Sequence, residues 1–262
     1  MNQENAAVGC RVEAGVATIT MNGPSLTVKA KDALVKAVLG VAADDDVRSV
    51  VLTGTGRVFC AGQDLGEHAE ALQVDSSAAF ATITEHYSPV ITALTTMPKP
   101  VVAAVNGTCA GAGLSLALAC DVRIAVSGAR FTTAFTAIGL TFDSGLSAFL
   151  SRAVGTARAS ELILLSEPFT AEQAVDWGMV GRIVPAENFA DAVASVAGKL
   201  AAGPTAAYAT AKMALQQAWA APLSEVLQTE DKAQQMLGLT ADHQGAVEAF
   251  LSKRTPTFTG RL

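Results

Sequence analysis

Three short segments of the sequence combine small and acidic residues in ways that could support catalysis. Residues 57–65 read RVFCAGQDL, where Gly62 would let the backbone bend sharply and approach a ligand closely. Residues 106–113 read NGTCAGAG, and small residues at the start of a helix leave backbone N–H groups free to hold a phosphate or a developing oxyanion. Residues 131–145 read FTTAFTAIGLTFDSG and place Asp143 in an otherwise apolar stretch. An apolar pocket would raise the pKa of such a carboxyl group and suit it to proton transfer.

Each segment also has a purely structural interpretation. Residues 57–65 could form an ordinary strand-to-helix turn, and an aspartate before Ser-Gly, such as Asp143, is often a helix cap. The GAG of residues 111–113 is not a Walker loop, since no Gly-Lys-Ser/Thr follows, and it is not a full dinucleotide fingerprint. Taken one at a time, the segments therefore leave both interpretations open.

The elements that would position these segments alternate between strands and helices. Apolar runs alternating with helices predict an α/β fold with parallel strand pairing. From about residue 145 the pattern is mainly helical, and Gly203-Pro204 and Ala221-Pro222 separate successive helices. The expected elements before that point are a hairpin of residues 8–13 and 16–22, a helix over about 29–43, and strands within 48–54, 98–107 and 121–126.

The composition excludes several classes of protein. The chain has 262 residues, of which 50% are hydrophobic and 16% charged, which excludes disorder and allows one large domain or two small ones. No uninterrupted apolar run reaches the roughly 18–20 residues of a membrane span. We therefore expect no membrane partner. The net charge of -6 comes without a Lys/Arg cluster, so we expect no binding of nucleic acid.

The cysteines and the N-terminus indicate a reducing environment. Cys10, Cys60, Cys109 and Cys120 show no CxxC or Cys/His spacing, so we expect no metal site. The first ten residues, MNQENAAVGC, have no basic stretch followed by an apolar core, and so do not resemble a signal peptide. We therefore expect a cytoplasmic protein.

Taken together, the three segments resemble the crotonase superfamily, also called the enoyl-CoA hydratase/isomerase family. The match continues through NGP (22–24), NGTCAGAGLSLALACDVRIA (106–125), AVGTARASELILLSEPFTAEQAVDWGMVGRIV (153–184) and FLSKRTPTFTG (250–260). The resemblance implies a spiral of stacked ββα units over residues 1–200 and a C-terminal helical oligomerisation region over residues 201–262. It also implies homotrimers that often pair into hexamers, an acyl-CoA thioester substrate, and no cofactor beyond the CoA of the substrate.

The resemblance also implies roles for particular residues. The backbone N–H groups of Gln63 and Ala112 would polarise the thioester carbonyl, and Asp143 would be the catalytic acid/base. Lys253 lies on the C-terminal helix that approaches CoA in this family, where it could pair with a phosphate. The full set of expected substrate-binding residues is Ala61, Gly62, Asp64, Leu65, Gly111, Ser115, Phe135 and Lys253.

The sequence departs from the family pattern at two positions. Hydratases of this family usually carry two glutamates, and Ser115 and Phe135 stand in their places. The segment AFTAIGLTFDSG is similar to that of the ring-epoxide isomerase subgroup of phenylacetyl-CoA breakdown, with Phe142 where proline is common. This resemblance implies an isomerase with Asp143 as its single acid/base. The alternatives are a hydratase or thioester hydrolase of the same superfamily, or a CoA-thioester-binding protein without catalysis.

Other polar residues are expected to be structural. Cys60 and Cys109 adjoin the two glycine-containing segments but have no evident histidine partner, so small buried packing roles are expected. His68 is expected at the surface or as a capping residue, and Asp64 and Asp121 are expected to make structural hydrogen bonds.

Overall fold

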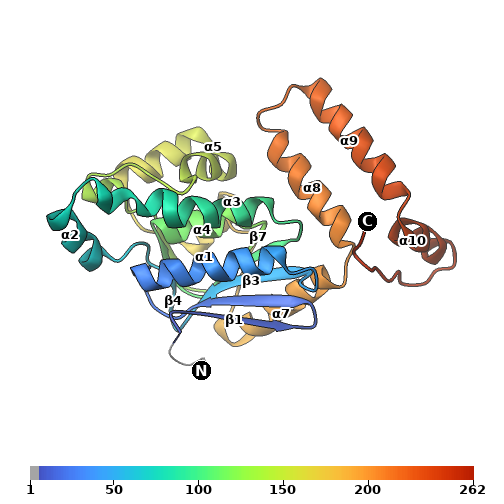
Figure 1. The fold of residues 1–262 in the computed structure, drawn as a ribbon, viewed down its shortest axis with the longest axis horizontal. Coiled ribbons are helices and arrows are strands. Elements are labelled where there is room, and N and C mark those ends of the chain that lie inside the picture. Colours follow the sequence, from blue (N-terminus) through green and yellow to red (C-terminus); the bar gives the residue numbers. More distant parts are fainter. Residues whose placement is uncertain (1–5) are drawn as a thin grey trace.

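The computed structural model describes residues 6–262 and shows two β-sheets surrounded by helices (Figure 1). The larger sheet has the strand order β1-β2-β3-β5-β7-β10, and the smaller has the order β4-β6-β8-β9. Strands β1 and β2 pair antiparallel, as do β8 and β9, and the other pairs are parallel. The strands are β1 (Val8–Glu13), β2 (Val16–Met21), β3 (Ser49–Gly54), β4 (Val58–Cys60), β5 (Val101–Val105), β6 (Thr108–Ala110), β7 (Val122–Val126), β8 (Arg130–Thr132), β9 (Phe169–Thr170) and β10 (Arg182–Val184).

Helices connect the strands, and local sequence explains where several of them begin. The Thr27 hydroxyl accepts a bond from the N–H of Ala30, and Thr170 forms a reciprocal capping box with Gln173. The helices are α1 (Val28–Ala43), α2 (Leu65–Val74), α3 (Ser88–Thr96), α4 (Ala112–Ala119), α5 (Leu146–Leu165), α6 (Ala171–Asp176), α7 (Ala186–Ala201), α8 (Thr205–Gln217), α9 (Leu223–Gly238) and α10 (Ala241–Leu251), with single turns η2 (Ala78–Phe80), η3 (Ile83–Tyr87) and η4 (Thr136–Ile138).

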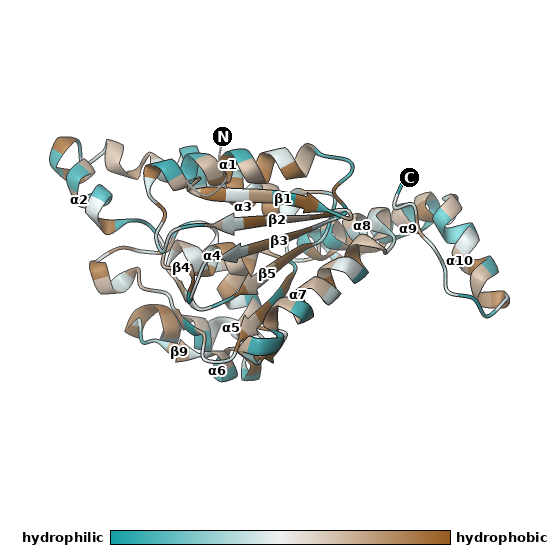
Figure 2. Ribbon diagram, turned by 90° about the horizontal axis from the view of Figure 1, so that it is seen from below, coloured by the Kyte–Doolittle hydropathy of each residue, from teal (hydrophilic) through white to brown (hydrophobic). Residues whose placement is uncertain are grey.

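The inner strands β3 and β5 of the larger sheet are buried on both faces, which explains their nearly continuous apolar sequences, whereas the edge strand β1 is mostly exposed. Side chains alternate between faces along a strand. In β3, Val50 and Leu52 join the main core, while Val51 joins a second core that also contains Val193 and Ala197 of α7. Figure 2 shows the apolar strands between α1 and α3 on one side and α7 on the other. Strands of a parallel sheet covered by helices on both faces have unbroken hydrophobic sequences, as β5 does with VVAAV.

The chain winds between the two sheets in repeated steps. Strands β3, β5 and β7 lie in the larger sheet, and each is followed directly by a strand of the smaller one, namely β4, β6 and β8. A helix or helical turn then returns the chain to the larger sheet. This arrangement confirms the predicted α/β fold of stacked ββα units.

The C-terminal helices α8, α9 and α10 extend away from the sheets on the side opposite α2 (Figure 1). The Nζ of Lys212, on α8, donates to the carbonyl of Leu94 at 2.6 Å and pairs with Asp121 Oδ2 at 2.9 Å, which ties this helix to the core. The division at residues 200 and 201 falls at the end of α7 and stays a prediction. Within residues 6–262, no helix has the length and apolarity needed to cross a bilayer.

Candidate active site

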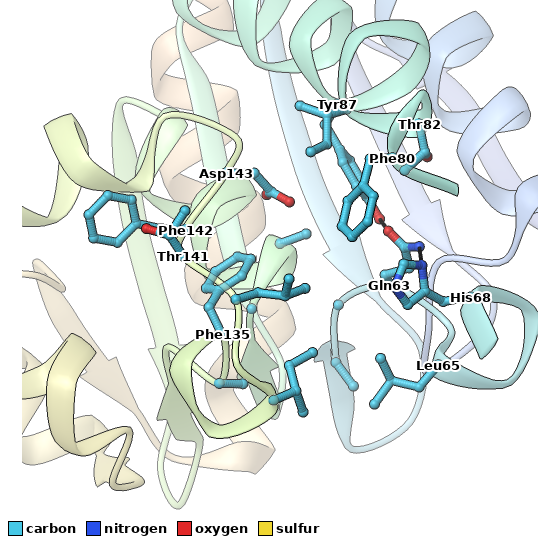
Figure 3. Close-up of a pocket in the computed structure, with 18 residues that line it drawn as sticks. Gln63, Leu65, His68, Phe80, Thr82, Tyr87, Phe135, Thr141, Phe142 and Asp143 are labelled. Carbon is cyan, nitrogen blue, oxygen red and sulfur yellow. Dashed lines mark hydrogen bonds between the residues drawn. The ribbon is translucent and has the colours of Figure 1, made fainter. Parts of the chain in front are cut away.

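The three segments singled out in the sequence meet at one cavity of about 270 Å³ (Figure 3). Most of its wall is apolar, and the polar side chains come from Gln63, His68, Thr82, Tyr87, Thr141 and Asp143. Such an apolar hollow with a few convergent polar groups is typical of a small-molecule site. The lining residues are Ala61, Gly62, Gln63, Leu65, His68, Phe80, Thr82, Ile83, Tyr87, Gly111, Ala112, Ala134, Phe135, Ile138, Leu140, Thr141, Phe142 and Asp143.

One wall of the cavity is formed by main chain from two adjacent segments, 61–63 and 111–112, which we call the backbone wall. Gly62 has φ +92°, and a Cβ placed there would lie 3.2 Å from the Ala110 carbonyl oxygen and 3.5 Å from the Ala112 nitrogen. A side chain would therefore push the two segments apart. Glycine at position 62 is required both for its positive φ and for this close approach.

The hydrogen bonds on either side of Gln63 direct its N–H away from Leu26, which lies alongside it. Leu26 donates to the Gly62 carbonyl at 2.8 Å and accepts from the Asp64 N–H at 3.2 Å, which is the pattern of a parallel bridge. Such a bridge uses the residues on either side of Gln63, so the Gln63 N–H points to the opposite side. No protein acceptor within residues 6–262 is bonded to it.

The second N–H of this wall belongs to Ala112, the first residue of α4. Every residue of this eight-residue helix is buried, and the preceding Gly111, with φ +53°, donates its own N–H to the Thr132 carbonyl at 3.2 Å. First-turn N–H groups have no partner inside a helix. In the described part of the chain the Ala112 N–H has no acceptor, so the backbone wall presents two free donors.

The opposite wall is the segment 134–143, which we call the carboxylate wall, and it ends at Asp143. The Ser144 hydroxyl donates to Asp143 Oδ1 at 2.7 Å, and Figure 3 shows the carboxylate directed between the two walls. Burial raises the pKa of Asp143 above the usual aspartate value, and the bond from Ser144 opposes that rise. Among the lining residues of the described chain, Asp143 is the only carboxylate.

Asp143 is not the helix cap that its sequence context also allowed. Helix α5 begins after Gly145, and no side chain caps it. The turn holding Asp143 is strained instead at Ser144, which has φ +54°, while the positive φ of Gly145 costs nothing because glycine has no Cβ. At the other end of this wall, Ala134 also has a positive φ, of +61°. Strained non-glycine residues persist where the surrounding structure holds them, often at functional sites.

A chain of polar side chains, which the sequence did not reveal, lies beside the backbone wall. The Tyr87 hydroxyl donates to Gln63 Oε1 at 3.1 Å, and Gln63 Nε2 lies 3.0 Å from His68 Nδ1. The prediction that His68 is a surface or capping residue is wrong, since it lines the cavity and packs edge-on against Phe80. Burial raises the pKa of Tyr87, so the phenol stays protonated.

Asp64, Ser115 and Lys253, expected among the substrate-binding residues, do not line this cavity. The Asp64 carboxylate caps α2 and accepts a bond from Ser25 at 2.7 Å, which lowers its pKa and confirms a structural role. Ser115 is fully buried in α4, and its hydroxyl has no partner within residues 6–262. Lys253 is exposed just after α10, on the far side of the molecule from α2.

Five of the eight expected substrate-binding residues do line the cavity, together with the three expected catalytic residues. Phe135 is 8% exposed and forms part of the carboxylate wall. The residues brought together in this way are Ala61, Gly62, Gln63, Leu65, Gly111, Ala112, Phe135 and Asp143.

The cysteines beside the backbone wall are packing residues, as predicted. Cys60 and Cys109 are buried, and burial raises the pKa of Cys60 to about 12 and that of Cys109 well above its usual value. A thiol in this state is a poor nucleophile. Among residues 6–262, no three His, Cys, Asp or Glu side chains are grouped to hold a metal ion.

Comparison with known proteins agrees with this geometry. The profile of the enoyl-CoA hydratase/isomerase family matches residues 11–261. The chain is 42% identical over 254 residues to a probable enoyl-CoA hydratase of Rhodobacter capsulatus, with 95% of this chain and 96% of that one covered. It is 39% identical over 254 residues to the 1,2-epoxyphenylacetyl-CoA isomerase of Escherichia coli, with 95% and 97% covered.

A solved structure shows the same likeness. The crystal structure of an enoyl-CoA hydratase/isomerase homologue from Mycobacterium abscessus superposes with a TM-score of 0.94 at 48% identity, covering 97% of this chain and 100% of that one. Family profile, sequence relatives and fold therefore agree over nearly the whole chain, and the protein belongs to the enoyl-CoA hydratase/isomerase family, the crotonase superfamily.

Proposed function

We propose that the protein isomerises acyl-CoA thioesters, moving the double bond of an enoyl-CoA or rearranging a ring-epoxide acyl-CoA through a thioester enolate. The observation that carries this proposal is the pairing of one buried carboxylate, Asp143, with two free backbone donors across an apolar cavity. The donors suit an oxygen that gains negative charge, and the carboxylate suits the removal of a proton.

For a 3-enoyl-CoA the proposed steps balance with one acid/base. The Asp143 carboxylate removes a proton from C2, and the electron pair moves onto the thioester oxygen, where the N–H groups of Gln63 and Ala112 hold it. The protonated Asp143 then returns the proton to C4, and the double bond moves from C3–C4 to C2–C3. Because no electrons leave the substrate, the proposed steps require no redox cofactor, and because the two N–H groups hold the enolate oxygen, they require no metal.

The surroundings of Asp143 favour isomerisation over hydration in this proposal. Hydration adds a water that a second group must orient, and two glutamates usually share that work in the family. Here Ser115 is sealed inside α4 and Phe135 presents an apolar ring, so neither supplies a second carboxylate. The likeness to the E. coli isomerase supports the same preference, while the likeness to the R. capsulatus protein makes hydration the reaction to test against.

The exposed apolar residues of the C-terminal helices support the proposal of a homotrimer or a hexamer. Trp219 and Phe250 expose 61% and 82% of their surface, and burial of such residues between symmetric copies would be favourable. We expect light scattering at micromolar concentration to give three or six chains, and a stable monomer would contradict this part of the proposal. The other exposed large apolar residues between positions 205 and 251 are Met213, Leu215, Leu223, Leu227, Met236, Leu239, Val247 and Leu251.

The function is tested by offering purified protein a 3-enoyl-CoA and a 2-enoyl-CoA in separate reactions and identifying the products. We expect 2-enoyl-CoA to form from the first faster than 3-hydroxyacyl-CoA forms from the second. With deuterium at C2, early time points should show some label at C4, because one carboxylate carries the proton between the two carbons. Faster formation of 3-hydroxyacyl-CoA would contradict the proposal and establish hydration.

A further inference from the structure

We propose that Tyr87 and His68 are positioning residues, which act through the Gln63 side chain to hold the Gln63 backbone N–H toward a bound thioester oxygen. The inference rests on the proposed function, because that function assigns this N–H to the developing oxyanion. The three side chains come from separate elements. Gln63 follows β4, His68 lies on α2, and Tyr87 ends η3 (Figure 3).

The Gln63 amide is hydrogen bonded at both ends. Its Oε1 accepts from the Tyr87 hydroxyl at 3.1 Å, and its Nε2 lies 3.0 Å from His68 Nδ1. Because an amide nitrogen only donates, His68 Nδ1 is the acceptor in this bond. The bonds therefore run in one direction, from Tyr87 through Gln63 to His68. Tyr87 is only 3% exposed, so solvent does not readily replace its hydroxyl.

The main chain around Gln63 is fixed from the other side by Leu26. Leu26 bonds to the Gly62 carbonyl and to the Asp64 N–H, at 2.8 and 3.2 Å. The Gly62 carbonyl and the Gln63 N–H belong to one planar peptide unit, so the bond from Leu26 to that carbonyl already sets the general direction of the N–H. The two bonds to Leu26 leave open only a tilt of the peptide about the line that joins them. The amide contacts to Tyr87 and His68 restrain that tilt, which sets the final direction of the Gln63 N–H.

The two donors of the backbone wall differ in how much support they have without side chains. Ala112 begins a helix that is buried throughout, so its N–H is fixed by packing. Gln63 instead precedes α2, which has no buried residue and exposes 55% of Leu65 and 89% of Val74. Elements with few buried contacts open most easily. Of the two donors, the Gln63 N–H therefore has the greater need of the Tyr87 and His68 contacts.

The thioester carbonyl of a bound ligand reports these donors directly, since hydrogen bonding lowers its stretching frequency. The probe is butanoyl-CoA with ¹³C at the thioester carbonyl, which is saturated and so has no double bond to move, observed by difference infrared spectroscopy. Tyr87→Phe removes only the hydroxyl, and Gln63→Met keeps the side-chain length while removing both bonds. His68→Leu removes the acceptor, whereas His68→Asn keeps an acceptor oxygen near the place of Nδ1. Tyr208→Phe, at the second of the chain's two tyrosines, is the matched control.

We expect the wild-type protein to lower the carbonyl frequency, and Tyr87→Phe, Gln63→Met and His68→Leu to return it toward the value in solution. His68→Asn and Tyr208→Phe should keep the wild-type shift. In the isomerase assay, the three disrupting variants should lose about 10- to 100-fold in kcat with KM nearly unchanged, because misplacing a donor weakens transition-state stabilisation more than ground-state binding. Two independent disrupting substitutions, Tyr87→Phe and Gln63→Met, keep the test valid if His68→Leu fails to fold.

Two results would overturn the inference, and they are distinguishable. A wild-type shift that persists in Tyr87→Phe and Gln63→Met would refute the positioning role while leaving the two backbone donors in place. A wild-type protein that binds butanoyl-CoA without shifting its carbonyl would refute the assignment of the donors, and with it the enolate mechanism of the proposed function.

Discussion

The backbone wall and the carboxylate wall present polar groups to the same cavity by different means. The backbone wall offers main-chain N–H groups, placed by the close approach of Gly62 to Ala112 and by the buried α4. The carboxylate wall offers one side chain, Asp143, on a turn whose Ser144 has a positive φ. The chemistry of the first wall therefore depends on conformation, and that of the second on residue identity. Substitutions should show that activity depends on the main-chain conformation of the backbone wall and on the side-chain identity of the carboxylate wall.

The largest effect is expected from removing the charge of the carboxylate wall. Asp143→Asn keeps the size of the side chain and its bond from Ser144, so acyl-CoA binding should persist while isomerisation falls about 10²–10⁴-fold. The measurements are product formation from a 3-enoyl-CoA and the affinity for a saturated acyl-CoA. Asp176→Asn, the same change at an exposed position, is the control. Equal activity of Asp143→Asn and wild type would contradict the assignment of Asp143.

The same variant also tests the cost of burying this carboxylate. The folded-state pKa of Asp143 is raised, so its favourable contribution to stability is present at low pH and is lost as the pH rises through that folded-state pKa. At neutral pH, Asp143→Asn should therefore be at least as stable as wild type in thermal melts. A clear loss of stability at neutral pH would contradict the raised pKa.

The next effect breaks the backbone wall without touching its donors. A Cβ on Gly113 would lie 2.2 Å from the Cys60 carbonyl oxygen, so Gly113→Ala must push α4 away from β4 and separate the two N–H groups. We expect a loss of about 1–3 kcal/mol in the free energy of unfolding, together with a fall in kcat. Gly198→Ala, in the last turn of α7 with nothing within 4 Å of the added carbon, should instead be neutral or stabilising. Denaturant unfolding of both variants measures the contrast.

A smaller effect is expected from removing the hydrogen bond that Ser144 donates to Asp143 in the carboxylate wall. Ser144→Ala removes the hydrogen bond that lowers the pKa of Asp143 and leaves its burial in place. Because Asp143 must be ionised to accept a proton, the acidic limb of kcat/KM should lie above the usual aspartate range in wild type and move to higher pH in the variant. Ser147→Ala, at a nearby exposed serine, should leave the limb unmoved. A shift to lower pH in Ser144→Ala would reverse the assigned role of Ser144.

The smallest effect on activity is expected behind the backbone wall, at Ser115. Its hydroxyl is buried without a partner in the described chain, so Ser115→Ala should leave isomerisation nearly unchanged and keep or raise stability. The equally buried Ser49 donates to the Ala197 carbonyl at 2.9 Å, and Ser49→Ala should cost about 0.5–1.5 kcal/mol. Thermal melts of Ser115→Ala and Ser49→Ala measure this difference in stability. A large loss of activity in Ser115→Ala would give this hydroxyl a role in the reaction.

The sequence predicted most of the larger sheet and much less of the cavity. Apolar runs such as VVAAV are long and continuous, so β3, β5 and β7 lie where they were expected, and the hairpin of β1 and β2 also follows the prediction. The short strands β4, β6, β8 and β9 have two or three residues each, too few to show a period, and were not separately predicted.

The sequence likewise predicted some of the site residues and missed others. Gln63, Ala112 and Asp143 sit in segments with recognisable motifs, and these segments meet at the cavity. Tyr87 was missed because it lies in a single helical turn without a motif, and its bond to Gln63 joins residues 24 positions apart. His68 was misjudged because its partner is a side chain that becomes its neighbour only through the turn before α2. Contacts of this kind depend on how the elements pack, which local patterns do not encode.

The placement of the four cysteines gives the protein an internal indicator of its own unfolding. Cys10 is exposed, while Cys60, Cys109 and Cys120 are buried, with pKa values of about 12 for Cys60 and Cys120 and a strongly raised one for Cys109. An alkylating reagent should therefore modify one thiol per chain while the sheets are intact. The other three are buried in the main core, on β4, on β6 and directly after α4, so their modification would require this core to open. Counting modified thiols by mass spectrometry would then follow core opening in the protein without any substitution.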